Sequence, residues 1–302
     1  MRVIKFFINV IMSFLLMVFI AICIAQNFIN NKLLNKDYFK AKIDDTGFYS
    51  QLSKEINDGF ENYVYQSGLP EDIVQDIFND EVLRNDINSI IAYVFDNGEL
   101  NTSEALVKQN LDNKITAYLN ANNIKLNEQG KSNIEGYEVL ISNEYRKKVV
   151  VSESLYSIAK DTVTLARKIM RRVRSMPITV CIIIIILLLI INRKNPLDAI
   201  YFGGISMLSC GGLLKVMDYF VNKNIKFDGL LIYSKSVTNL FVNVCNEILN
   251  MIEDYSTFLM VCGGVSILVT AILNSFVKKT DENDETPRFK PKRRKKYYSQ
   301  NV

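Results

Sequence analysis

The chain has 302 residues, of which 49% are hydrophobic, and its formal net charge is +4. It contains neither histidine nor tryptophan, and the missing histidine excludes Ser-His-Asp and Cys-His catalysis, HExxH zinc sites and imidazole proton switches. A chain of this length accommodates about two domains.

Hydrophobic residues are concentrated in segments with unequal spacing. A run of about 20 apolar residues is long enough to cross the roughly 30 Å hydrocarbon core of a bilayer. A long polar region, residues 26–176, separates the first segment from the second. We therefore predict an all-α integral membrane protein with four transmembrane helices and a helical extracytoplasmic domain between the first and the second. The apolar segments are Phe6–Ala25, Ile178–Ile191, Ala199–Val221 and Phe258–Phe276.

The first segment, within residues 1–25, is predicted to be an uncleaved signal-anchor helix. Its basic start also fits a cleaved signal peptide, and Cys23-Ile24-Ala25 is a tolerable cleavage pattern. Its apolar run of about 20 residues, however, exceeds the roughly 7–15 residues of a signal-peptide core. We therefore favour the anchor over the cleaved peptide.

Residues 26–176 are predicted to form a bundle of about four to six helices. Hydrophobic residues recur every three or four positions, which places them on one face of each helix. A short helix is expected to begin at Pro70, and the helix after it is expected to end at Asn97-Gly98. The predicted faces are Phe48, Leu52, Ile56, Phe60 and Tyr63; Ile73, Val74, Ile77 and Phe78; Val82, Leu83, Ile87, Ile90, Ile91 and Val94; Leu106, Val107, Leu111, Ile115 and Leu119; and Ile134, Tyr137, Ile141, Tyr145 and Val149.

The last helix of this region is expected to continue into the second membrane segment. No proline or glycine interrupts the chain from Tyr137 to Met176. The β-branched triplet Val149–Val151 is the one place where a break or a short strand is expected.

Charge is distributed unevenly along this region. Residues 26–166 are acidic, with 14 Lys and Arg against 22 Asp and Glu, so a nucleic-acid partner is not expected. A basic cluster follows, immediately before the second membrane segment. We expect it to contact lipid phosphates or an acidic surface of the domain. The cluster comprises Arg167, Lys168, Arg171, Arg172 and Arg174.

Residues 177–277 are expected to hold three membrane helices that pack through small side chains, because such residues let helix backbones approach closely. The triplet at 210–212 recurs at 262–264, which predicts a close antiparallel contact between the third and fourth helices. A metal-binding or redox thiol pair is the alternative, but two thiols without histidine or carboxylate form a weak site. The helix-packing candidates are Gly203, Ser206, Cys210, Gly211, Gly212, Cys262, Gly263 and Gly264.

An ion pair is predicted near the end of the third segment, where Lys215 and Asp218 lie three positions apart. Ionisable residues at membrane depth often mark functional sites. Structural pairing at the interface is the favoured interpretation, and an ion or proton pathway is the alternative.

Two features flank the fourth segment. An amphipathic helix is expected at about residues 236–253, either on the bilayer surface or, as we favour, beneath the helical domain, because it has few basic residues for lipid headgroups. Residues 278–302 are predicted to form a disordered basic cytoplasmic tail. Its run of Arg293, Arg294, Lys295 and Lys296 either attracts anionic lipid or acts only as a topology signal.

The positive residues predict an orientation. With four crossings, Arg2, Lys5, Arg193, Lys194 and the basic tail share one side, which the positive-inside rule makes cytoplasmic. The protein is then expected in the plasma membrane, with the bilayer as a partner, both termini in the cytoplasm and residues 26–176 outside it.

Known motifs are incomplete. Gln129-Gly130-Lys131-Ser132 ends like a phosphate-binding loop, but Lys125 stands where the first glycine is needed. The order of one crossing, a large outer domain and three further crossings is similar to that of FtsX-like permease subunits of ABC transporters. Those permeases carry a basic coupling helix before the third crossing, where this chain has only Asn192-Arg193-Lys194-Asn195-Pro196. The similarity therefore stops at topology.

The sequence favours a non-enzymatic membrane protein, of a bacterial type, whose outer domain binds an envelope or protein partner as a scaffold or sensor. A permease-like subunit of a transporter complex is the alternative. No cofactor or metal is expected, and the oligomeric state stays open.

Overall fold

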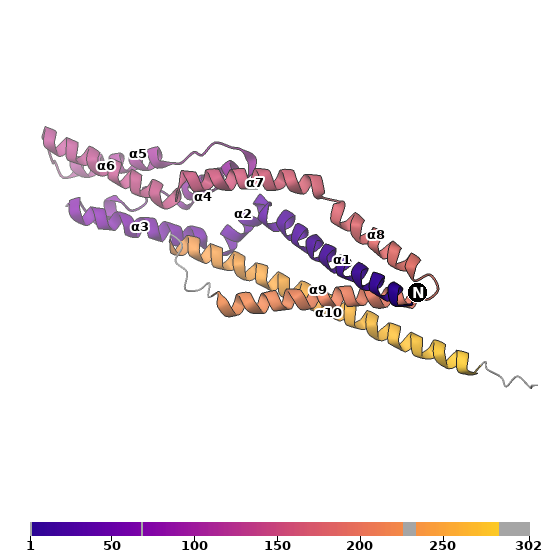
Figure 1. The fold of residues 1–302 in the computed structure, drawn as a ribbon. Helices are drawn as coiled ribbons and strands as arrows, with labels where there is room; N and C mark the ends of the chain where they lie inside the picture. Colours follow the sequence, from indigo (N-terminus) through magenta and orange to yellow (C-terminus); the bar gives the residue numbers. More distant parts are fainter. Residues whose placement is uncertain (1, 68, 226–233, 284–302) are drawn as a thin grey trace, which may run out of the picture.

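The computed structural model describes residues 2–67, 69–225 and 234–283, and this part of the chain contains helices and no strand (Figure 1). The elements are α1 (Arg2–Phe28), the π-helical turn η1 (Ile29–Leu33), α2 (Lys36–Asp45), α3 (Phe48–Ser67), the 3-10 turn η2 (Glu71–Ile73), α4 (Asp80–Asp96), α5 (Glu104–Ala121), α6 (Glu128–Val149), α7 (Glu153–Val173), α8 (Met176–Ile191), α9 (Pro196–Asn224) and α10 (Lys235–Asn283).

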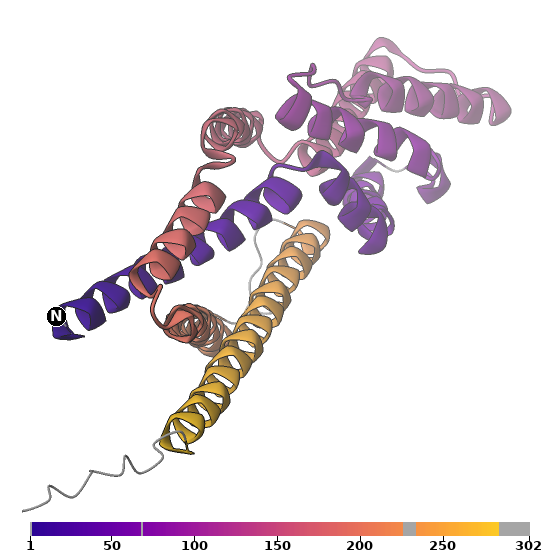
Figure 2. The ribbon, with the colours of Figure 1, turned by 90° about the vertical axis from the view of Figure 1, so that its right-hand side faces the viewer.

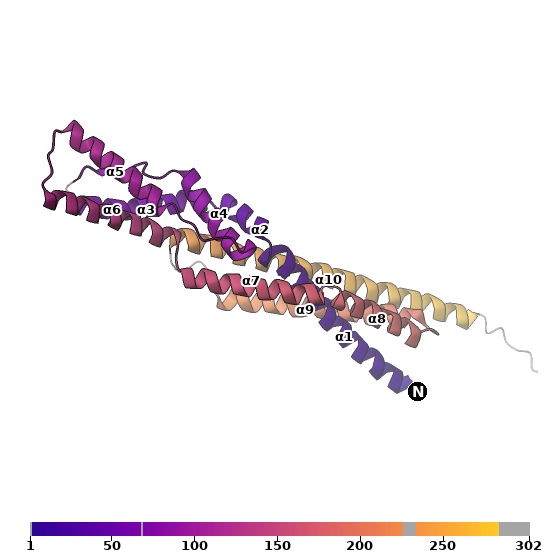
Figure 3. The same cartoon turned by 90° about the horizontal axis from the view of Figure 1, so that it is seen from above.

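The molecule is elongated, with two regions along its length. Four helical stretches, which contain α1, α8, α9 and α10, are long and apolar enough to cross a membrane. These helices lie together at one end, which we call the membrane bundle, whereas α2–α7 lie toward the other end and form the helical domain (Figures 1 and 3). Figure 2 shows α8 beside α1 and α9 beside α10, which agrees with the contacts among these helices.

The helical domain has one apolar core, which α3, α4, α5 and α6 build. The face predicted from Phe48 to Tyr63 points inward, and Ile56 and Phe60 are completely buried. One buried acid joins three helices near this core. Asp86 of α4 accepts hydrogen bonds from the backbone and hydroxyl of Ser103, before α5, and from the hydroxyl of Tyr145 on α6. The carboxylate is thereby satisfied although its side chain is only 3% exposed.

The prediction of a short helix that begins at Pro70 is wrong. Only the turn Glu71–Ile73 forms, although the apolar residues that follow it are buried as expected. The backbone takes a positive φ of 53° at Asp76, which cannot continue a right-handed helix. Asn79 then caps α4 by accepting a hydrogen bond from the amide of Val82.

The long helix expected from Tyr137 into the membrane is broken twice. The break anticipated at Val149–Val151 is present, because α6 ends at Val149 and Ser152 caps the start of α7. The second break, at residues 174–175, was not predicted. Pro177 lies in the first turn of α8, where its missing amide proton removes no helical hydrogen bond. The same residue disfavours a helix that continues from α7 into α8, because proline inside a helix removes a hydrogen bond and clashes with the preceding turn.

The helix expected at about 236–253 is not a separate element. It is the first part of α10, which continues without interruption to Asn283 and therefore includes the first residues assigned to a disordered tail. No glycine or proline separates this amphipathic part from the membrane segment at the point where they join, so one helix carries both. Val237 and Leu240 pack against the domain core, so α10 connects both regions.

Candidate binding sites

The closest helix contact in the membrane bundle joins α9 and α10, which run antiparallel. A Cβ atom added at Gly263 would lie 2.6 Å from the carbonyl oxygen of Gly204 and 2.6 Å from the amide of Leu208. A Cβ at Gly211 would lie 2.7 Å from the carbonyl oxygen of Ser256. All three distances are shorter than any ordinary contact of a carbon atom, so positions 211 and 263 require glycine.

The other small-residue candidates are placed differently. Added Cβ atoms at Gly203, Gly212 and Gly264 meet nothing within 4 Å, so these three do not mediate the contact. The two Cys-Gly-Gly triplets also do not face each other, because Gly211 lies against Ser256 and Gly263 lies against Gly204. In each triplet the central glycine lies in backbone contact with the neighbouring helix, whereas the last glycine points away from it, as the helical period requires.

Ser206 belongs to a contact with α1 instead of α10. Its hydroxyl lies 2.8 Å from that of Ser13, and both side chains are buried. Cys210 is completely buried against Leu214 and Leu259, while Cys262 is half-buried. All cysteines are free, and the described residues contain no cluster of three metal ligands.

The predicted pair of Lys215 and Asp218 is part of a larger arrangement. The Lys215 ammonium lies 2.5 Å from a carboxylate oxygen of Glu253 on α10 and 3.9 Å from one of Asp218. Asp218 accepts a hydrogen bond from Asn222. Glu253, which the sequence analysis missed, is therefore the main partner of Lys215, and the interaction crosses between two helices.

The basic cluster before α8 divides into three parts. Arg167 is half-buried and donates hydrogen bonds to the carbonyl oxygens of Leu34 and Phe95, so it holds the domain and does not face lipid. Arg171 and Arg174 are exposed and line a cavity of about 550 Å³. Lys168 and Arg172 are exposed outside that cavity. The tail residues Arg293, Arg294, Lys295 and Lys296 lie outside the described residues.

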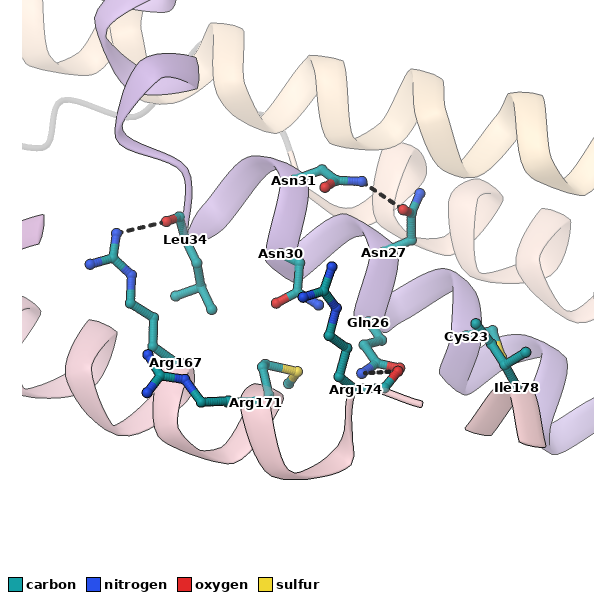
Figure 4. A pocket seen from close by; sticks show the side chains of 11 residues that line it. Cys23, Gln26, Asn27, Asn30, Asn31, Leu34, Arg167, Arg171, Arg174 and Ile178 are labelled. Carbon is teal, nitrogen blue, oxygen red and sulfur yellow. Dashed lines mark hydrogen bonds between the residues drawn. The ribbon is translucent and has the colours of Figure 1, made fainter. Parts of the chain in front are cut away.

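This boundary cavity lies where α1 leaves the membrane bundle and α7 meets α8 (Figure 4). Gln26 at its base donates hydrogen bonds to the carbonyl oxygens of Val173 and Arg174, both at 3.2 Å. No aspartate or glutamate is among the described residues that line it. The lining comprises Cys23, Gln26, Asn27, Asn30, Asn31, Leu34, Arg167, Met170, Arg171, Arg174 and Ile178.

A second cavity, the distal cleft, lies between the end of α3, the end of α5 and the start of α6. These helix ends meet at the tip of the domain farthest from the membrane bundle (Figures 1 and 3). The cleft has a volume of about 770 Å³, and the described residues that line it include no acidic or basic side chain. Its lining comprises Tyr63, Ser67, Leu69, Tyr118, Leu119, Ile124, Leu126, Gly130, Ser132, Asn133, Ile134, Gly136, Tyr137 and Leu140.

Tyr137 in the distal cleft has an unusual environment. Its hydroxyl is buried and makes no hydrogen bond of good geometry among the described residues, although the Ser67 side chain lies near enough to lower its pKa slightly. Burial raises the pKa of this hydroxyl to about 12, so it stays protonated at neutral pH and can donate a hydrogen bond. Ile124 and Leu140, at the opening, are 43% and 42% exposed.

Comparison of the chain with protein-family models, with curated proteins and with solved structures found no match. Functional inference therefore depends on the two cavities and their positions in the fold.

Proposed function

We propose that this chain is a non-enzymatic integral protein of the plasma membrane, whose helical domain lies outside the cytoplasm and binds a protein partner of the envelope through the distal cleft. The observation that carries the proposal is the cleft itself. Its lining carries no charged side chain and combines apolar residues with hydroxyl groups, it has the volume of an ordinary ligand site, and it lies at the tip of the domain.

The unsatisfied hydroxyl of Tyr137 supports a binding role. A buried polar group without a partner costs about 1–3 kcal/mol, so a folded chain rarely retains one without a reason. A partner segment that brings an apolar side chain and one backbone carbonyl would fill the cleft and accept this hydrogen bond. A peptide segment of a protein has both groups.

The attachment of the domain supports a scaffold or sensor. The domain joins the membrane bundle through α1, through the α7–α8 junction and through the continuous α10. Glu247 of α10 strengthens the last connection, because its carboxylate contacts Lys32, Lys42 and the hydroxyl of Tyr38. A domain held at three points presents its tip at a fixed distance from the bilayer.

The positions of basic residues support the proposed orientation. Arg193 and Lys194 lie in the short turn between α8 and α9, at the end of the bundle away from the domain. The positive-inside rule puts that end in the cytoplasm. The same turn, residues 192–195, contains no helix, and so the permease-like alternative lacks the coupling helix on which an ATPase would dock.

Crosslinking in native membranes tests this function. We expect a partner to crosslink with the wild type and to be lost from the double variant Ile124→Lys with Leu140→Lys. The matched control is Leu155→Lys with Ile158→Lys on α7, whose side chains are 56% and 62% exposed but lie outside the cleft. Equal loss in both variants, or no partner with the wild type, contradicts the proposal, and so does hydrolysis of wall polymers or peptides by the purified protein.

Tyr137→Phe sharpens the test, because partner capture should fall without a loss of stability. Removal of an unpaired buried hydroxyl should leave the thermal stability unchanged or raise it, by up to about 1 kcal/mol. Partner capture should fall, because the donated hydrogen bond is lost. Reduced stability together with unchanged capture would show that the hydroxyl serves the fold alone.

A further inference from the structure

We propose that the boundary cavity binds the phosphate of a phospholipid headgroup, from the leaflet on the domain side. This inference does not depend on the partner that the distal cleft binds. It starts from Arg167 and Arg171 on one face of α7 and from Arg174 at the C-terminal cap of that helix, which are four and three positions apart.

The cavity is strongly positive and lacks a compensating protein charge. Among the ion pairs of the described residues, none involves Arg167, Arg171 or Arg174. Figure 4 shows Arg174 extending across the cavity toward Asn30 and Arg171 lying along α7 toward Arg167. A bound anion would offset the positive charge of the arginines that line the cavity.

Two carbonyl oxygens that would repel an anion are already occupied. The last carbonyl oxygens of a helix carry partial negative charge, and α7 ends beside the cavity. Gln26 donates to two of these oxygens, on Val173 and Arg174. The lining also offers guanidinium groups and the NH2 groups of asparagine amides, which can donate to phosphate oxygens.

The position of the cavity favours a lipid over a soluble phosphate. Its membrane-facing side is formed by Cys23 and Ile178, the residues where α1 and α8 enter their apolar segments. Ile178 and Ile182 of α8 are 56% and 53% exposed, so an apolar surface continues from the cavity along the bundle. Acyl chains can lie on this surface while the phosphate contacts the arginines. The arginines then lie at the membrane interface, at the depth of a phospholipid phosphate.

The experiment counts lipids that stay bound to the full-length protein. The wild type is purified from nanodiscs containing phosphatidylglycerol, or phosphatidylcholine alone, and the lipids retained after washing with detergent are counted by native mass spectrometry. The test variant is Arg171→Gln with Arg174→Gln. The control is Lys168→Gln with Arg172→Gln, which removes the same charge from the same helix outside the cavity.

We expect the wild type to retain phosphatidylglycerol in preference to phosphatidylcholine. The test variant should retain it about tenfold less, and the control should behave as the wild type. Arg171→Lys with Arg174→Lys should give an intermediate result, because lysine keeps the charge but loses the bidentate geometry. Thermal unfolding of each variant establishes that it is folded.

Three results overturn the proposal. Equal losses in the test and control variants would mean that the basic surface attracts lipid without a site. No selective retention by the wild type would mean that no lipid site exists. Stabilisation by millimolar inorganic phosphate, without competition from phosphatidylglycerol, would assign the cavity to a soluble anion instead of a lipid.

Discussion

The helical domain and the membrane bundle are both made of helices, but different side chains hold them together. The domain buries large apolar residues such as Ile56, Phe60 and Leu111 in one continuous core. The bundle leaves many of its large apolar residues exposed on the outside. Beside a few buried ones such as Leu188 and Phe202, it buries small and polar residues, including Asn9, Asn192 and Ser256.

This difference follows from the two solvents. Water drives apolar side chains into the core of the domain. Lipid tails give no such drive, so membrane helices associate through close backbone approach and hydrogen bonds. In the bundle, Ser256 donates to the carbonyl oxygen of Gly211, and the amides of Asn9 and Asn192 bond to each other. Substitutions should therefore act differently, and separately, in the two regions.

The largest effect is expected in the domain, at the buried acid. Asp86→Asn should destabilise the domain by about 2–4 kcal/mol, because an amide group would then face donors from Ser103 and Tyr145. Hydrogen exchange should show lost protection in α4–α6 and unchanged protection in α9 and α10. The control is Asp80→Asn, the same change at an exposed position of α4. Loss of protection in both regions would show that they unfold together.

A somewhat smaller effect is expected in the bundle. Gly263→Ala should destabilise the α9–α10 contact by about 1–3 kcal/mol, because the new methyl group meets backbone atoms that cannot move aside. Gly264→Ala adds the same atom where nothing lies within 4 Å, and it should be neutral or mildly stabilising. Thermal unfolding in detergent measures both. Equal effects at the two positions would contradict the packing described for this contact.

The sequence predicted the buried helix faces best where apolar residues recur with the helical period. The faces at Phe48–Tyr63 and at Val107–Leu119 were readable because amphipathic helices repeat every three to four residues. The assignment of Leu106 to the second face was wrong, because its side chain is 40% exposed. The contact at Gly211 and Gly263 was anticipated as a pairing of small-residue segments, but its register was not. A run of small residues does not show which of them faces the partner helix. Gly212 and Gly264, where an added Cβ meets nothing within 4 Å, therefore looked equivalent to the glycines that pack.

Features that depend on tertiary contacts were missed. The sequence shows Lys215 and Asp218 as neighbours, but Glu253 comes close only through the antiparallel register of α9 and α10. Arg167 looked like its basic neighbours until its hydrogen bonds to Leu34 and Phe95 were visible. The sequence contained no sign of the distal cleft, because the apolar residues that line it also fit the pattern of ordinary buried helix faces.

Removing the charge of Glu247, which connects the two regions, is expected to have an intermediate effect on stability that depends on pH. Burial alone would raise the pKa of Glu247, but hydrogen bonds from Lys32, Lys42 and Tyr38 outweigh it and lower the pKa from 4.5 to about 2. A lowered pKa means that the carboxylate stabilises the fold above pH 4.5 and loses this contribution as the pH falls toward 2.

Glu247→Gln should therefore lower the stability by about 1–2 kcal/mol at neutral pH. The difference from the wild type should be constant between pH 6 and 8 and should shrink below pH 4.5. Thermal unfolding of both proteins across this range provides the measurement. A difference that grows on acidification would contradict the assigned partners.

The smallest effect is expected at the hydrogen bonds between α1 and α9. Ser13→Ala removes the hydroxyl that bonds to Ser206 and to the carbonyl oxygen of Phe202. Side-chain hydrogen bonds between membrane helices contribute about 0.6 kcal/mol on average, so the unfolding temperature should fall only slightly. Ser209→Ala, on the exposed face of α9, is the control and should have no effect. A loss as large as that of Gly263→Ala would show that polar contacts, not glycine packing, dominate the bundle.

The central claim is that a membrane bundle with four crossings holds the helical domain outside the cytoplasm. The most direct test replaces all five cysteines by alanine and introduces one cysteine, at Lys125 in the domain or at Lys194 in the α8–α9 turn. Intact cells are then treated with a membrane-impermeant maleimide. We predict that Lys125→Cys is labelled in intact cells and that Lys194→Cys is labelled only after permeabilisation. The reverse pattern would mean that the protein has the opposite orientation, with the helical domain in the cytoplasm. Labelling of both cysteines in intact cells would show that α8 does not cross the membrane.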